Sequence, residues 1–203
     1  MTPDLPPRVS GTRASGRRVR ADRQRNVELL ISAARTLFDT RGTDVPLDEI
    51  ARRAGVGNAT LYRNFPTRGD LLVAVYSEEV EALCGQGDAL RGTADPGQAL
   101  FDWLGLFVTH AATRRPLAMA AIGADSGTRG GELAHDWHAA MGATTAALLA
   151  PAQDAGVVRG DVTAADVLAL VNAIALAGAD PPDAVRLIGL LRGGLETRAA
   201  RRP

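Results

Sequence analysis

Apolar residues recur at the spacing of an α-helix along most of the chain, and this periodicity constrains the fold more than any other feature. The clearest run, at i, i+3, i+4 and i+7, consists of Val27, Leu30, Ile31, Ala34, Leu37 and Phe38. Only 4% of the residues are aromatic although 46% are hydrophobic, which favours closely packed helices over a β-sandwich. The sequence therefore predicts an all-α protein.

About nine helices are expected, separated by glycine and proline. The first four are predicted at residues 22–41, 46–54, 58–64 and from Thr67 to Gly85 or beyond. The other five are predicted at about 96–114, 117–123, 131–149, 163–179 and 182–198. Thr67 and Asp70 have the spacing of a capping box, which would begin the fourth helix.

Charge is distributed unevenly along a chain whose net charge is zero. Residues 1–70 hold thirteen arginines against eight acids, whereas residues 71–203 hold ten against fifteen. Residues 1–20, rich in Pro, Gly, Ser and Arg, are predicted to be a disordered basic arm. Its Arg17, Arg18 and Arg20 are either part of a solvated tail or residues that enter a DNA minor groove.

Several classes of protein are disfavoured by what the sequence lacks. Cys84 is the only cysteine, so neither an intramolecular disulfide nor a Cys-based metal cluster is expected. Residues 167–179 form the longest apolar stretch and are too short to span a bilayer, so we expect a cytoplasmic protein without a membrane partner. Glu132, His135 and His138 have metal-like spacing, but no second such helix accompanies them, so we expect no metal and no cofactor.

The segment AGVGNATLYRNFPTRGDLL, residues 54–72, carries the most specific chemistry. Its predicted helix of about seven residues is too short to be stable alone, so Leu61 and Phe65 should anchor it. Ala59, Thr60, Tyr62 and Arg63 would then face outward. A small residue, hydroxyls and an arginine are the groups that a helix needs in a DNA major groove, and the preceding Gly-containing turn is typical of a helix-turn-helix.

The run LDEIARRAGVGNATLYRNFPTRGDLL resembles the DNA-binding signature of the tetracycline-repressor (TetR) family, over about residues 22–75. The resemblance implies a three-helix DNA-binding domain at residues 21–66, with its motif at 46–65, and an effector-binding and dimerisation domain at 67–203. It also implies a homodimer on a palindromic double-stranded DNA operator. The DNA-contacting residues carried over are Asn58, Ala59, Thr60, Tyr62, Arg63, Asn64 and Arg68.

Individual roles follow from the same resemblance. Tyr62 would contact phosphate, Thr60 and Asn58 would lie near phosphates or base edges, and Arg68 replaces the family's usual lysine. Arg63 has three interpretations: a reader of bases, a phosphate contact or a solvated arginine. The chain departs from the family pattern at three positions: Pro46 and Gly57 stand where hydroxyl residues often cap helices, and Asn64 replaces a frequent histidine. Without the two hydroxyls, two side-chain bonds to phosphate that the family pattern implies do not follow from this sequence. Backbone N–H groups at those helix ends can still bind phosphate.

The C-terminal part is expected to bind an effector and to dimerise. Broad apolar faces on the last two helices predict either pairing with a second copy or burial within one chain. Candidate residues of a pocket for a small, mostly apolar effector are Trp103, Phe107, His110, Met119, Trp137, His138 and Met141. The alternative for each of them is simple core packing.

The sequence thus predicts a ligand-responsive transcription regulator, with repression favoured. The rival is an enzyme or binding protein with a vestigial helix-turn-helix. No Ser-His-Asp order, P-loop or nucleotide fingerprint supports it, so no catalytic residue is assigned and we expect no enzyme.

Overall fold

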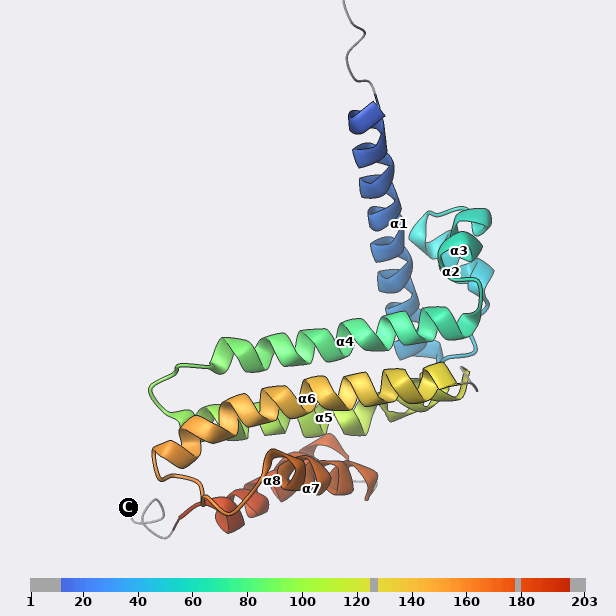
Figure 1. Ribbon diagram of the computed structural model, residues 1–203. Coiled ribbons are helices and arrows are strands. Elements are labelled where there is room, and N and C mark those ends of the chain that lie inside the picture. The colour runs from blue at the N-terminus through green and yellow to red at the C-terminus, as the bar shows by residue number, and fades with distance from the viewer. Residues whose placement is uncertain (1–11, 125–127, 178–179, 198–203) are drawn as a thin grey trace, which may run out of the picture. The chain divides into compact units, whose positions relative to one another are not determined.

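The structure, a computed structural model, describes residues 12–124, 128–177 and 180–197 (Figure 1). These residues form eight α-helices and no strand, which confirms the predicted all-α class. The helices are α1 (Thr12–Arg41), α2 (Leu47–Ala54), α3 (Asn58–Asn64), α4 (Arg68–Leu90), α5 (Pro96–Ala124), α6 (Thr128–Asp154), α7 (Ala164–Leu176) and α8 (Pro181–Leu195). The chain divides into two compact units, Met1–Leu71 (unit 1) and Leu72–Pro203 (unit 2).

Unit 1 is built on the predicted apolar face of α1, which packs against α2 and α3. Leu30 and Ala34 on α1 are fully buried, as is Ile50 on α2. Gly55 ends α2 in the left-handed conformation, with φ of 67°, and its N–H donates to the carbonyl of Arg52. A residue without a Cβ adopts this conformation at little cost, so Gly55 produces the sharp turn towards α3.

The start of α4 is fixed by the predicted capping box. The Asp70 carboxylate accepts hydrogen bonds of 2.8 Å from both the backbone N–H and the hydroxyl of Thr67. The Thr67 hydroxyl in turn accepts the N–H of Asp70 at 3.1 Å. These bonds satisfy backbone donors that the first turn of a helix leaves unpaired.

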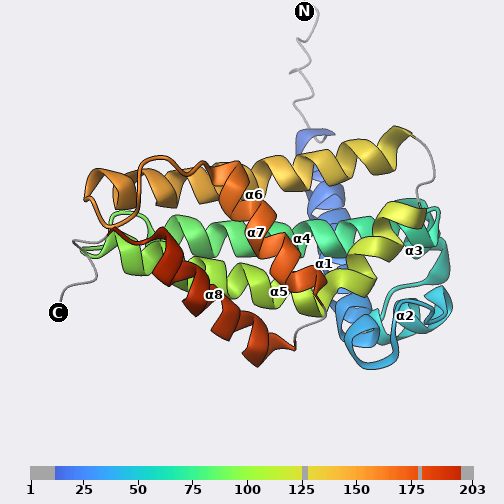
Figure 2. The same ribbon diagram turned by 90° about the horizontal axis from the view of Figure 1, so that it is seen from below.

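Unit 2 consists of three layers of helices (Figures 1 and 2). α5 and α6 run side by side as the central layer, and α7 and α8 cross one face of it. α4 covers the other face, where the indole of Trp103 on α5 donates a 3.0 Å hydrogen bond to the carbonyl of Leu83 on α4. None of the helices within the described residues is long and apolar enough to cross a membrane.

Two prolines that were expected to end helices lie inside them instead. Pro116 is within α5, so the helices predicted at 96–114 and 117–123 are one helix, and the expected number of about nine is one too high for the described residues. Pro151 is likewise within α6, which continues to Asp154. Buried residues on both sides, such as Val108 and Leu117 around Pro116, hold the helix together although proline removes one backbone hydrogen bond. In Figure 2 the second half of α5 runs at an angle to the first.

The N-terminal arm also differs from its prediction as a disordered segment over residues 1–20. Residues 12–20 belong to α1, and residues 1–11 lie outside the described residues. The physical reason is cooperativity, because a helix already nucleated by its buried half extends through good helix formers such as Arg and Ala at little cost.

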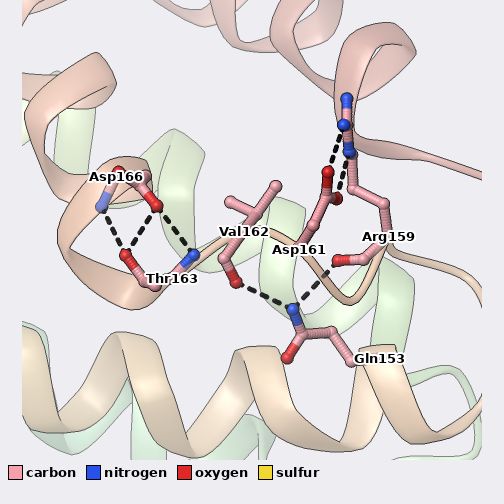
Figure 3. Close-up of polar contacts among 6 residues, drawn as sticks. All are labelled: Gln153, Arg159, Asp161, Val162, Thr163 and Asp166. Atoms are coloured by element: carbon pink, nitrogen blue, oxygen red, sulfur yellow. Dashed lines mark hydrogen bonds and ion pairs between the residues drawn. The ribbon is translucent and has the colours of Figure 1, made fainter.

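The connection from α6 to α7 is held by side-chain hydrogen bonds (Figure 3). The Gln153 amide donates at 2.9 Å to the carbonyls of both Arg159 and Val162. Thr163 and Asp166 form a capping box that begins α7, and this contact lowers the pKa of the Asp166 carboxyl. The same connection pairs with the end of α8, where the Arg159 N–H donates to the carbonyl of Leu195 at 3.0 Å. These bonds fix where α7 and α8 lie on the central layer.

Two glycines of α4 provide a test of the packing in unit 2. A Cβ on Gly87 would overlap the Thr144 methyl group and lie 2.9 Å from Nε1 of Trp103, whereas a Cβ on Gly85 would meet nothing within 4 Å. We expect Gly87→Ala to lower the free energy of unfolding by about 1–3 kcal/mol through overpacking. The control Gly85→Ala should raise it by up to about 1 kcal/mol, because alanine is the better helix former. Urea denaturation measures both, and equal effects would contradict this packing.

Candidate functional site

The predicted recognition helix α3 is held in place by two apolar side chains. It has seven residues, fewer than the roughly 12–15 at which an isolated helix becomes marginally stable. Leu61 is fully buried and Phe65, just past the helix end, is 6% exposed. The Phe65 N–H also donates to the Leu61 carbonyl at 2.8 Å. α3 therefore depends on unit 1 for its stability.

The opposite side of α3 is exposed and carries the predicted DNA-contacting residues. Asn58, Ala59 and Arg63 are exposed, and Tyr62 is 47% exposed although it is large and aromatic. Thr60 is half-buried. The Arg63 guanidinium forms no hydrogen bond or ion pair with any residue that the structure describes. A cation and an aromatic side chain are thus both exposed on one short helix.

Asn64, at the end of α3, is fixed by two hydrogen bonds. Its side-chain oxygen accepts from Nε of Arg23 on α1 at 3.0 Å, and its side-chain nitrogen donates to the carbonyl of Thr60 at 2.8 Å. Arg23 was not among the predicted site residues. It is 41 residues away in sequence, so only the fold brings the two together. The contact keeps an additional exposed cation beside α3.

Arg68 is anchored on the backbone of unit 1. Its Nη1 donates to the carbonyls of Thr43 and Val45, at 2.8 and 2.6 Å, and its side chain is half-buried. Arg68 therefore ties the start of α4 to the segment between α1 and α2, a structural contact that sequence reasoning missed. Pro46 and Gly57 cap α2 and α3 without any side-chain hydrogen bond, as expected from their residue types.

Unit 2 contains a cavity of about 330 Å³ between α4, α5, α6 and α7. Most of its lining is apolar. The lining residues are Tyr76, Phe107, Ala111, Arg115, Ala118, Met119, Trp137, His138, Met141, Leu168, Asn172, Ala175 and Leu176. A cavity of this size and character can hold a small organic molecule.

Five of the seven residues predicted for the pocket line this cavity: Phe107, Met119, Trp137, His138 and Met141. Trp103 and His110 do not. Trp103 is fully buried beside Phe107, with ring centroids 5.5 Å apart. Sequence reasoning did not identify Tyr76 or Asn172, because the sequence gave no sign that α4 and α7 close the cavity. It also missed Arg115, which lay between two predicted helices that are one helix, α5, in the structure. The side chain of Glu132, the first of the three residues with metal-like spacing, lies outside the described part.

Two of the lining residues, Tyr76 and Trp137, belong to an aromatic cluster that also includes His110. The Tyr76 ring meets Trp137 edge-on, with centroids 4.6 Å apart, and lies 5.6 Å from the ring of His110. The Trp137 indole donates to the hydroxyl of Ser77 at 3.1 Å. Burial raises the pKa of Tyr76 to about 12, with a further contribution from Glu79, so its hydroxyl stays protonated.

His110 is neutral in this cluster. Burial lowers its pKa to about 4, because the imidazolium would lose hydration, and the nearby Arg114 guanidinium adds to the effect. Arg114 itself pairs with Glu79 at 3.2 Å. Nε2 of His110 is buried without a hydrogen-bond partner among the described residues.

Both units match known families of bacterial regulators. Residues 30–75 match "Bacterial regulatory proteins, tetR family", and residues 95–197 match "Transcriptional regulator SbtR-like, C-terminal domain". The HTH-type transcriptional activator FasR from Mycolicibacterium smegmatis is 37% identical over 94 residues. That alignment covers 46% of this chain and only 42% of FasR.

Solved structures match over most of the chain. A TetR transcription regulatory protein from Mycobacterium vanbaalenii is 37% identical, with a TM-score of 0.69, and the match covers 88% of this chain and 99% of that one. A TetR transcriptional regulator from Streptomyces coelicolor is 34% identical, also with a TM-score of 0.69, over 85% of this chain and 99% of that one.

The buried His110 predicts a pH-dependent stability. Between its pKa of about 4 in the folded protein and about 6.5 in the unfolded chain, only the unfolded state binds the proton, so stability falls as the pH falls through this window. From about pH 7 to about pH 5, His110 should cost the protein about 2 kcal/mol of unfolding free energy.

Urea denaturation at the two pH values, on wild type and His110→Gln, measures this cost. The variant should lose about 2 kcal/mol less than the wild type. The control His135→Gln, at an exposed position on α6, should lose as much as the wild type. An equal pH dependence in all three proteins would show that His110 is not held neutral by burial.

Proposed function

The chain belongs to the TetR family of DNA-binding bacterial transcription regulators, and we propose that it binds a palindromic operator as a homodimer and releases it when an effector fills the cavity of unit 2. The family and the structural neighbours are transcription regulators, not enzymes. This excludes the alternative interpretation of an enzyme with a vestigial helix-turn-helix. As a regulator of bacterial genes, the protein acts in the cytoplasm.

The observation that carries the DNA-binding proposal is the exposed side of α3. Arg63 and Tyr62 are solvent-exposed and Asn58 begins the helix, while Leu61 on the other side is fully buried. In the major groove, an arginine without an internal partner can donate two hydrogen bonds to one guanine edge. Tyr62, Thr60 and Asn58 contact phosphates or nearby base edges, which fixes the register of the helix on the duplex.

Exposed apolar residues on the last two helices support the homodimer. Leu170 on α7 and Val185 and Leu190 on α8 are exposed, Leu190 by 65%. Large apolar side chains exposed together mark a surface that a partner covers. A two-fold homodimer on a palindromic operator would carry two copies of α3, and half-sites one DNA turn apart are separated by about 34 Å.

The cavity supports a small, mostly apolar effector. Because its walls come from α4, α5, α6 and α7, a ligand within it would contact most of unit 2. A ligand that binds the DNA-free state more tightly lowers DNA affinity by the same factor, through thermodynamic coupling.

We favour repression, because a repressor that leaves its operator when the effector binds allows transcription to begin. One observation favours activation as a second candidate: FasR, 37% identical over 94 residues, is named a transcriptional activator. The position of the operator separates the two, because a site overlapping the promoter blocks polymerase and a site upstream of it permits activation.

Arg63 provides the sharpest test of DNA reading. We expect Arg63→Ala to flatten the sequence preference at one or two positions of each half-site, by about 1–3 kcal/mol per position. Genomic fragments retained by the purified protein supply the operator. Competition gel retardation with single-base variants of that operator then measures the preference.

Two further variants complete the design. Arg63→Lys keeps the charge but cannot form the bidentate contact, so it should retain the salt dependence of binding and still lose the preference. Arg68→Ala should weaken binding to all sequences alike and lower the salt slope by about one. It should also destabilise unit 1, because its bonds to Thr43 and Val45 are lost. If Arg63→Ala and Arg68→Ala weakened every sequence equally, Arg63 would not be a base reader.

A further inference from the structure

The cavity of unit 2 has apolar walls and a limited size. Phe107, Trp137 and Met141 line it and are nearly inaccessible to solvent. Its volume of about 330 Å³ lies near the lower end of the roughly 300–1,000 Å³ range of small-molecule sites. The body of a ligand must therefore be compact and apolar.

Besides the imidazole of His138 on α6, three polar groups interrupt these walls, and each comes from a different helix. They are the hydroxyl of Tyr76 on α4, the guanidinium of Arg115 on α5 and the amide of Asn172 on α7. None of the three forms a hydrogen bond or ion pair with a residue that the structure describes. Arg115 is exposed and Asn172 is half-buried, so both are hydrated in the empty cavity and can exchange that water for the polar atoms of a ligand.

Arg115 determines the charge that the cavity prefers. Among the described residues lining the cavity, it alone carries a permanent charge, and no carboxylate lines the cavity with it. A cationic ligand would therefore be repelled, and a purely apolar one would form no hydrogen bond with the guanidinium. The planar guanidinium matches a carboxylate, to which it can donate two parallel hydrogen bonds.

The same residues indicate which end of the ligand lies at the cavity entrance. Arg115 precedes Met119 by one helical turn, and Asn172 precedes Leu176 by one turn. Met119 and Leu176 are 60% and 59% exposed, so they lie at the open side of the cavity. Tyr76, in contrast, is buried in the aromatic cluster.

We infer that the cavity binds an organic monocarboxylate with a compact apolar body, its acid group at the entrance between Arg115 and Asn172 and its body against Phe107, Trp137 and Met141. A phosphate monoester fits less well, because its second charge would find no second arginine or lysine among the described lining residues. The inference rests on the proposed function in one respect only, namely that this cavity binds a small organic ligand.

Three probes with one apolar body test the charge preference: 4-phenylbutanoate, its primary amide and 4-phenylbutylamine. Their affinities are measured by tryptophan emission of the full-length protein without DNA, since Trp137 lines the cavity. The acid should bind at least about tenfold more tightly than the amide, and the amine most weakly. In Arg115→Gln the acid should lose this advantage, whereas Arg115→Lys should keep part of it.

The control Arg91→Gln removes an exposed arginine that pairs with Asp88, follows the last residue of α4 and does not line the cavity, so this variant should bind all probes like the wild type. Thermal melts confirm that each variant is folded. Equal binding of acid and amide by the wild type, undiminished acid binding by Arg115→Gln, or no binding of any probe at millimolar concentration would each overturn the inference.

A gel retardation experiment with the same probes separates the two proposals. If the acid binds with the expected preference but leaves DNA affinity unchanged, the monocarboxylate site stands and the effector role in the proposed function fails. If the wild type binds operator DNA but shows no preference for the acid, the monocarboxylate inference fails and the DNA-binding part of the proposed function stands.

Discussion

The burial of Leu61 and Phe65 is the contact on which the recognition surface depends. A helix of seven residues does not persist in water, so α3 exists only because these side chains complete the core that α1 and α2 begin. Because Leu61 and Phe65 on the inner side stabilise α3, residues on the outer side, such as Tyr62 and Arg63, do not have to contribute to the core. Asn64 and Arg68 add polar ties to α1 and to the segment before α2.

Unit 2 combines a cavity with a stable helical core. α5 serves both purposes: Trp103 and Val108 are fully buried, while Phe107, Ala111 and Arg115, each one turn apart, line the cavity. The helix continues through Pro116, which allows Met119 to remain on the same lining surface. The hydrogen bonds of Gln153 and the capping box of Thr163 position α7, which closes the cavity from the other side.

Local patterns predicted the local structure well. Backbone geometry ends α2 at Gly55 and α3 before Pro66, and hydrogen bonds between Thr67 and Asp70 begin α4. Because these effects involve only adjacent residues, α2, α3 and the start of α4 could be placed from sequence. Pro116 and Pro151 misled the prediction because packing on both sides outweighs the local cost of proline. The cavity was only partly predictable: bulky residues such as Trp137 and Met141 were found, but Tyr76, Arg115 and Asn172 meet only in the fold. The contact between Arg23 and Asn64 could not be predicted either, because the two residues are 41 positions apart and meet only in the fold.

The central claim is that the exposed side of α3 enters the major groove of operator DNA, twice per dimer. Methylation protection tests it most directly, because dimethyl sulfate modifies guanine N7, which lies in the major groove. On a genomic fragment that the protein retains, the account predicts two groups of protected guanines whose centres are about 10 base pairs apart. Protection from hydroxyl radicals along the backbone without any protection of guanine N7 would contradict the claim.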